Sequence, residues 1–379
     1  MMNIFLSLGA TLVLTWLSGT RGEAVPELVL DERVLSISLV AANLSVLAYK
    51  NAADYAVVDA EGKFAHPDYE EITFYQEEPD QAVVAKKEGR CYLAFRGTTG
   101  NAADWLQNFR LGSSNVCKDN GPETDSECCE TRSGYTEFLV RAPAVQASAD
   151  LVTCLDSVCT DENKDDCLVI TGHSQGGALA TVASVALYSR LPTVITFGQP
   201  PAMDKDCDFI PSERFYRYVN SMKEIGENDD IGFDLISFSP STWSNSVHYG
   251  YYILVGEDPT AVKYLGFDEA YEFTPAQADW QKDAHSMNGK PYSYQTRMSN
   301  LVSNIPNVTT NGFSEGSSCE SGRYGYQQLC ESAICENYQC LSMDGVKTIN
   351  DRNGGLDGAS CAFIAGLNLA CVFLAIAVL

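Results

Sequence analysis

The residues best suited to chemistry lie in one short stretch, Gly172-His173-Ser174-Gln175-Gly176. A serine with a glycine two positions before and after it is the pattern of a nucleophile elbow, a sharp strand-to-helix turn that exposes the serine. Any side chain larger than hydrogen at Gly172 or Gly176 would collide with the neighbouring strand or helix. A helix N-terminus beneath Ser174, together with the backbone N–H of Gln175, would stabilise a negatively charged oxygen. The stretch predicts nucleophilic catalysis by Ser174, and the alternative is a glycine-rich turn with an idle serine.

The sequence on either side supplies the strand and the helix that such a turn needs. Residues 168–171 form an apolar, β-branched run that favours a buried strand, and residues 177–190 are rich in helix-forming alanine and leucine. We expect further strands at 55–58, 72–75, 82–85, 91–96, 193–197, 215–220 and 251–255, and helices at 35–49 and 134–158. This alternation predicts an α/β fold with a mostly parallel sheet. The polar stretches 117–132 and 223–234 are expected to be loops, and the core candidates of the helix at 134–158 are Phe138, Leu139, Val152 and Leu155.

An ordered set of motifs resembles the fungal-type triacylglycerol lipases, the class-three lipase family of the α/β-hydrolase superfamily. Besides the elbow, they are Phe95-Arg96-Gly97-Thr98, Asp104-Trp105-Leu106, Gly134-Tyr135, Thr196-Phe197-Gly198-Gln199-Pro200 and Tyr216-Arg217-Tyr218-Val219-Asn220. The resemblance covers roughly residues 35–300. It implies an α/β-hydrolase fold, a mostly parallel central sheet flanked by helices. The composition of the late part of the chain, rich in Gly, Ser, Asn, Glu and Cys, predicts a small Cys-rich C-terminal extension outside this fold.

The resemblance also implies a Ser-His-Asp triad, and its acid is harder to locate than its serine. The family's acid follows the Val-Asn strand closely, but Lys223 occupies roughly that place here. We therefore expect an insertion, after which Asp234 reproduces the family's spacing to a proline six positions later. Asp229 and Asp230 are the alternatives.

The base is expected late in the domain, which favours His285 among the four histidines. His248, just before a strand, is the alternative, and Ala284 stands where the family usually has an aspartate. His66 lies in an early loop before any triad element, and His173 should point away from the substrate side. The backbone N–H groups of Thr98 and Gln175 are the expected oxyanion hole, with the Thr98 hydroxyl as a possible aid.

These parts imply a secreted hydrolase that cleaves lipid esters through an acyl-enzyme, with no cofactor and no metal. Residues 100–109 would be a lid, with Trp105 facing the site; plain core packing of Trp105 is the alternative. A feruloyl-type esterase, another polysaccharide esterase or a phospholipase would use the same chemistry. A function of another class is a non-catalytic cell-surface protein on a hydrolase fold.

Composition limits the partners of the chain. A net charge of -25 and a pI of about 4.4 exclude most nucleic-acid roles, because phosphate contacts need a basic face. They also disfavour electrostatic docking to anionic lipid. A neutral lipid or other ester at an interface fits better, and we expect a monomer.

Fourteen cysteines in a secreted chain suggest disulfides. Eight lie between 91 and 207 and four between 319 and 340, so each region can pair internally. Cys128 and Cys129 cannot easily pair with each other. Zinc binding by the late cluster is the alternative, although no histidine lies near it.

Both ends of the chain carry targeting signals. Residues 1–23 predict a secretory signal peptide, with a membrane anchor as the alternative. The hydrolase domain is expected at 24–305 and a Cys-rich stalk at 306–353. The apolar tail at 354–379 predicts GPI attachment at Asn353 and display on the outer cell surface or wall, with a transmembrane helix as the alternative. Asn43 and Asn307 open glycosylation sequons.

Overall fold

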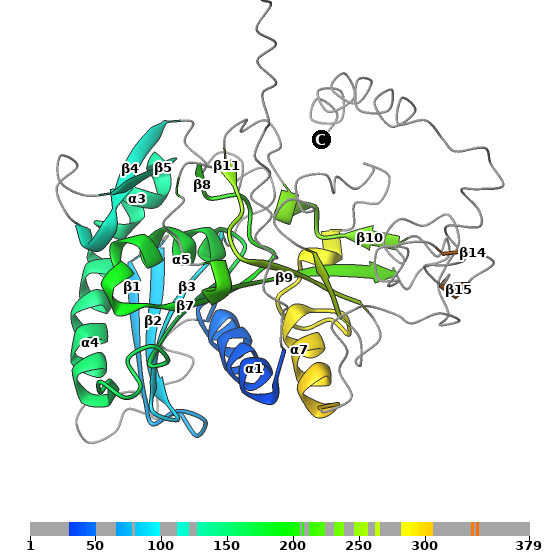
Figure 1. Ribbon diagram of the computed structural model, residues 1–379, viewed down its shortest axis with the longest axis horizontal. Helices are drawn as coiled ribbons and strands as arrows, with labels where there is room; N and C mark the ends of the chain where they lie inside the picture. Colours follow the sequence, from blue (N-terminus) through cyan, green and yellow to red (C-terminus); the bar gives the residue numbers. More distant parts are fainter. Residues whose placement is uncertain are drawn as a thin grey trace, which may run out of the picture.

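A twisted, mostly parallel sheet forms the centre of the computed structural model (Figure 1). The structure describes residues 30–50, 66–77, 80–98, 112–120, 127–204, 207, 212–223, 231–238, 246–256, 262–265, 282–305, 335–336 and 339–340. The strand order is β1-β2-β3-β6-β7-β9-β12-β13, with β10 paired to β9. Neighbours from β3 to β12 are parallel, and the remaining pairs are antiparallel. The predicted α/β fold is confirmed.

The strands of this sheet range from three to nine residues. Their bounds are β1 Glu71–Glu77, β2 Asp80–Lys87, β3 Arg90–Phe95, β6 Leu168–His173, β7 Thr193–Phe197, β9 Phe215–Lys223, β10 Ile231–Phe233, β12 Tyr251–Val255 and β13 Val262–Leu265. The helices are α1 Glu32–Leu47, α3 Ser133–Leu139, α4 Ala142–Val158, α5 Gln175–Ala186 and α7 Tyr294–Ser303. The strand expected at 55–58 and the lid expected at 100–109 lie outside the described residues.

Helices cover both faces of the sheet. Alternate residues of one strand enter different cores: Leu93 of β3 packs in a cluster with α3, α4 and α5, whereas Tyr92 packs in a cluster with α1 and α7. This follows from the two-residue period of a strand, whose successive side chains point to opposite faces. A strand buried on both faces reads as a continuous apolar run, which is why these strands were predictable.

Helix α1 is a buried packing helix that reaches the site with its C-terminal end. The carboxylate of Asp31 caps its start by accepting a hydrogen bond from the backbone N–H of Val34, at 2.8 Å. Most of its residues are buried, because α1 packs against the sheet on one side and against α7 beside it. It ends at Leu47, and Tyr49 follows it directly into the pocket described below.

Two expectations about local structure were wrong. The single helix expected at 134–158 is two helices, α3 and α4, bent by 57° at Val140 and Arg141. Pro143 in the first turn of α4 explains the break, since proline has no N–H to continue the helical ladder. Val152, a core candidate, is on the outer side of α4 and 39% exposed.

The stretch expected to be a loop at 117–132 contains strands of a second sheet. Strands β4 (Ser113–Cys117) and β5 (Cys128–Arg132) pair as a hairpin, and β8 (Met203–Asp204) and β11 (Ser246–Val247) extend it. Two short strands, β14 (Cys335–Glu336) and β15 (Gln339–Cys340), pair in the late part of the chain.

The acidic insertion at 223–234 is also more than a loop. Its ends form the hairpin of β9 and β10, in which Phe233 faces Ser221. The hairpin therefore returns the chain to the end of β9, where the backbone N–H of Asp234 donates to the carbonyl of Asn220 at 3.1 Å.

All eight cysteines between 91 and 207 are paired within that region, as predicted. The four disulfides are Cys91–Cys154, Cys117–Cys128, Cys129–Cys207 and Cys159–Cys167. Cys128 and Cys129 bond to different partners because neighbouring side chains of a strand point to opposite faces.

Within the described part of the chain, no single helix is both long and apolar enough to span a membrane. Helices α3 and α4 are long and apolar enough only when taken together, and they are bent at their junction. Among the same residues, no group of His, Cys, Asp or Glu side chains has the arrangement of a metal site. The predicted signal peptide, most of the stalk and the apolar tail lie outside the described residues.

Candidate active site

Ser174 occupies a strained turn between β6 and α5. Its backbone has φ 59° and ψ -130°, a region that non-glycine residues rarely enter. A Cβ added at Gly172 would lie 2.2 Å from the carbonyl oxygen of Gly176, and one at Gly176 would lie 2.2 Å from that of Phe95. Both positions therefore require glycine, as the sequence predicts for a nucleophile elbow.

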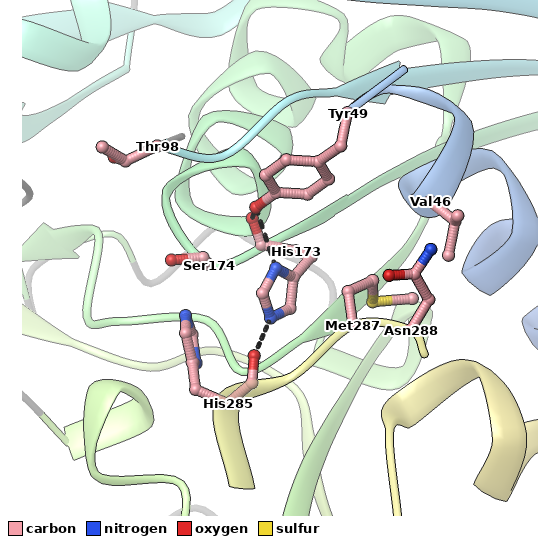
Figure 2. Close-up of a pocket in the computed structure, with 8 residues that line it drawn as sticks. All are labelled: Val46, Tyr49, Thr98, His173, Ser174, His285, Met287 and Asn288. Atoms are coloured by element: carbon pink, nitrogen blue, oxygen red, sulfur yellow. Dashed lines mark hydrogen bonds between the residues drawn. The ribbon is translucent and has the colours of Figure 1, made fainter. Parts of the chain in front are cut away.

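The Ser174 hydroxyl faces a pocket of about 250 Å³ that is lined by residues from four separate segments of the chain. We expected the turn to expose Ser174, but the residue is only 3% exposed. A substrate would therefore reach it through the pocket. The lining residues are Val46, Tyr49, Thr98, His173, Ser174, His285, Met287 and Asn288 (Figure 2).

His285 and Asp234 form a hydrogen-bonded pair beside this pocket. The Nδ1 atom of His285 lies 2.9 Å from both carboxylate oxygens of Asp234. The ring of His285 stands next to Ser174 in the pocket, with a ring nitrogen turned toward the serine hydroxyl (Figure 2). Because Nδ1 is engaged by Asp234, Nε2 is the nitrogen available to the serine.

Asp234 is fully buried, yet its hydrogen bonds favour the ionised form. Burial alone would raise the pKa of its carboxyl group, but the charge of His285 and hydrogen bonds from His285 and Tyr294 outweigh burial and lower it. The Tyr294 hydroxyl donates to Oδ2 at 2.5 Å, and the backbone N–H of Ile236 donates to Oδ1 at 3.0 Å. Asp234 is thus an acceptor held by several donors.

Gly198 allows the His285–Asp234 pair to sit against the end of β7. Its φ is +57°, and an added Cβ would lie 2.3 Å from Oδ2 of Asp234 and 3.0 Å from Nδ1 of His285. No larger residue fits this backbone position without moving the pair.

The side chains of Thr98 and Gln175 contact each other next to Ser174. The hydroxyl of Thr98 donates to Oε1 of Gln175 at 2.6 Å. The hydroxyl proton is therefore engaged by the glutamine in this structure rather than directed at an oxyanion. The Gln175 backbone N–H belongs to the first residue of α5, where helix N–H groups have no partner within the helix.

The alternative candidates are placed elsewhere or not described. His248 lies outside the pocket and contacts the carbonyl oxygen of Ser237 through Nε2, at 2.8 Å. His66 accepts from the backbone N–H of Asp68 at 3.2 Å. Asp229 and Asp230 lie outside the described residues, as does Trp105.

Three residues that sequence reasoning did not assign to the site support it. The Asn220 side chain donates to the carbonyl oxygen of Ala284 at 2.9 Å and so holds the residue before His285. The Tyr294 hydroxyl bonds Asp234 and accepts from the Asn220 backbone N–H at 3.0 Å. Tyr49 contacts His173. Only Asn220 had a sequence signal, as the last residue of the Val-Asn motif.

The sheet order, the strained serine at the end of β6 and the buried His–Asp pair together define an α/β-hydrolase. Residues 92–224 match the family model described as Lipase (class 3). The match covers about a third of the chain and agrees with the family resemblance that the sequence motifs indicated.

Comparisons with individual proteins find similar chains. Triacylglycerol lipase OBL1 of Ricinus communis is 31% identical over 108 residues, which are 24% of this chain and 20% of the relative. The chain thus matches about a fifth of that relative's length.

Two solved structures are similar. The triacylglycerol lipase of Penicillium expansum has a TM-score of 0.46 and 17% identity, covering 64% of this chain and 87% of its own. A mutant form of MDLA of Penicillium cyclopium has a TM-score of 0.47 and 15% identity, and the similarity covers 70% of this chain and 97% of its own.

Proposed function

We propose that this protein is a serine hydrolase that cleaves carboxylic esters of neutral lipids through a covalent acyl-enzyme. The observation that carries the proposal is the arrangement of a strained Ser174 at a pocket that also contains His285, whose other side is bonded to the buried Asp234. A serine hydroxyl is a weak nucleophile by itself and needs such a base.

In the proposed reaction, Nε2 of His285 removes the hydroxyl proton of Ser174 as its oxygen attacks the ester carbonyl. Asp234 keeps the Nδ1 proton in place and stabilises the imidazolium that forms. The oxyanion of the tetrahedral intermediate accepts hydrogen bonds from the backbone N–H groups of Thr98 and Gln175. His285 then returns the proton to the leaving alcohol, and water cleaves the acyl-enzyme by the same steps.

The test of the nucleophile is covalent labelling. A fluorophosphonate probe should label the wild-type protein and fail to label Ser174→Ala, because only an activated serine reacts with it. Ser184→Ala is a matched control, since Ser184 lies in the same helix, α5, but bonds only the carbonyl oxygen of Thr181. Equal labelling of wild type and Ser174→Ala would contradict the assignment of the nucleophile, and a wild-type protein that is not labelled would favour a non-catalytic surface protein.

The substrate class needs a separate measurement. Hydrolysis of short and long acyl esters, compared below and above their solubility limits, should rise for the long chains when an interface forms. Turnover that is confined to soluble aryl or phospholipid esters would instead favour a feruloyl-type esterase or a phospholipase.

We further infer that the enzyme acts outside the cell, anchored through its C-terminal tail. The four disulfides support an oxidising compartment. The proposal for the tail rests on sequence alone: small residues near Asn353 precede a final apolar run. Phosphatidylinositol-specific phospholipase C should release the esterase from intact cells, whereas a retained peptide ending at Leu379 would indicate a transmembrane helix.

A further inference from the structure

We propose that Tyr49 and His173 are positioning residues that align the oxyanion loop, the nucleophile and the base of the active site. This inference rests on the proposed function and adds to it a set of contacts that the triad itself does not include. The relay, as we call it, comprises the backbone of Gly97, the hydroxyl of Tyr49, the ring of His173 and the backbone carbonyl of His285.

The ring of His173 is bonded at both nitrogens. Nδ1 lies 2.9 Å from the Tyr49 hydroxyl, and Nε2 lies 2.8 Å from the carbonyl oxygen of His285 (Figure 2). The expectation that His173 points away from the substrate side was therefore incomplete, because its ring lines the pocket and ends on the backbone of the candidate base.

These contacts fix the direction of the two hydrogen bonds that the His173 ring makes. A carbonyl oxygen can only accept, so Nε2 of His173 carries the proton and Nδ1 of the neutral ring accepts from Tyr49. The Tyr49 oxygen is then free to accept the hydrogen bond from the Gly97 backbone. Burial, and next the charge of His285, hold the pKa of His173 well below its usual value, so the ring stays neutral.

The relay joins three segments that must be aligned for catalysis. Gly97 precedes the oxyanion residue Thr98, His173 precedes the nucleophile Ser174, and the His285 carbonyl belongs to the base itself. The space is closely fitted, because a Cβ added at Gly97 would lie 2.1 Å from the Tyr49 oxygen. The rings of His173 and His285 also pack together, with centroids 4.4 Å apart and planes at 36°.

A shift of about 1 Å in such a group can cost on the order of a hundredfold in rate. Tyr49→Phe keeps the ring but removes the hydroxyl, which leaves Nδ1 of His173 and the Gly97 N–H without this partner. We expect kcat to fall by about ten- to a hundredfold, with KM nearly unchanged, and the rate of fluorophosphonate labelling to fall in parallel.

Ser45→Ala is the matched control for a purely structural role. The Ser45 hydroxyl lies 3.2 Å from that of Thr171 in a buried contact between α1, which Tyr49 follows, and β6, which ends at His173; this contact is away from the pocket. We expect this variant to lose as much thermal stability as Tyr49→Phe but to keep kcat within about twofold. Equal losses of kcat in the two variants, at matched stability, would overturn the relay while leaving the proposed function intact.

Variants of His173 test the direction of the relay. His173→Gln keeps an N–H donor for the His285 carbonyl, whereas His173→Phe keeps only a ring. We expect kcat to decrease from wild type to Gln to Phe, and Tyr49→Phe to add nothing to His173→Phe. Additive losses, or a fully active His173→Phe, would overturn the relay. A wild-type protein that neither hydrolyses esters nor reacts with the probe would overturn the proposed function and the relay with it.

Discussion

At the scale of single residues, the assignment of Asp234 as the candidate acid of the triad can be tested directly by mutation. Its carboxylate is buried, bonded to His285 and to Tyr294, and has a lowered pKa. Asp234→Asn would leave the imidazole in the wrong tautomer, and we expect kcat to fall about ten-thousand-fold. Asp230→Asn serves as the control and should be mild. Steady-state hydrolysis of a p-nitrophenyl ester measures both, and a severe loss in Asp230→Asn would move the acid to the insertion.

Thr98 and Gln175 allow a double-mutant test of what the threonine hydroxyl does. Thr98→Val and Gln175→Leu each remove one side of the same 2.6 Å hydrogen bond but keep the backbone N–H groups. If this bond only braces the oxyanion loop, each variant and the double variant should lose about fivefold in kcat, the worth of one hydrogen bond. A hundredfold loss in Thr98→Val with none in Gln175→Leu would instead make the hydroxyl an oxyanion donor.

His173 should make the stability of the protein dependent on pH. Burial, and then the charge of His285, lower its pKa well below the ordinary 6.5 in the folded state. Below pH 6.5 the unfolded chain therefore binds a proton at this ring that the folded chain does not, so stability falls as pH falls. Relative to His173→Gln, the unfolding free energy of the wild type should fall more steeply, by up to about 1.4 kcal/mol per pH unit. Urea titrations between pH 7.5 and 5 measure this difference, and equal slopes would contradict it.

At the scale of elements, the β9–β10 hairpin explains how the chain departs from the family's spacing and still places the candidate acid, Asp234, beside His285. Ser221 and Phe233 face each other, so residues 222–232 can be replaced by the two-residue turn Asn-Gly. We expect this shortened enzyme to keep kcat within about threefold, because Asp234 would return to the end of β9. Loss of labelling in a folded variant would show that the hairpin itself completes the site.

The elements that sequence could predict are those with an unambiguous physical signal. Strands such as β6 and β7 are apolar on both faces, and the elbow needs glycine at two positions for reasons of space. The hairpin of β4 and β5 was missed because its residues are polar, acidic or cysteine, which usually indicates a loop. The break between α3 and α4 was signalled only by Pro143, and the apolar pattern on either side concealed it.

The candidate site could be predicted where a motif indicated a residue, and not where tertiary packing alone placed it. Ser174, His285 and Asp234 follow from spacing within a family pattern, and the structure brings all three to one place. Tyr49 is the residue that no pattern indicates, because a tyrosine after a helix has many possible partners. Its contact with His173 depends on how α1 crosses β6, which sequence alone does not specify.

At the scale of the whole molecule, the site is assembled from segments that are distant in the chain. Tyr49 comes from the end of α1, Thr98 from the loop after β3, Ser174 from the end of β6, and His285 from a late turn. The central sheet holds these segments at one edge, as parallel sheets do at the carboxyl ends of their strands. The β9–β10 hairpin brings the candidate acid, Asp234, to the same edge, where its backbone N–H bonds to the carbonyl of Asn220 in β9.

The disulfides have a consequence for how the molecule would respond to a protease. The loop closed by Cys91 and Cys154 overlaps the loop closed by Cys129 and Cys207, so together they enclose every peptide bond from 91 to 207. A single cut anywhere in this region leaves the two pieces covalently joined. Nicked protein should therefore run as one band on a non-reducing gel and as two after reduction, and separation of the pieces without reductant would contradict the pairing. If the protein acts outside the cell, as we propose, Thr98 and Ser174 would stay on one covalent body after such damage.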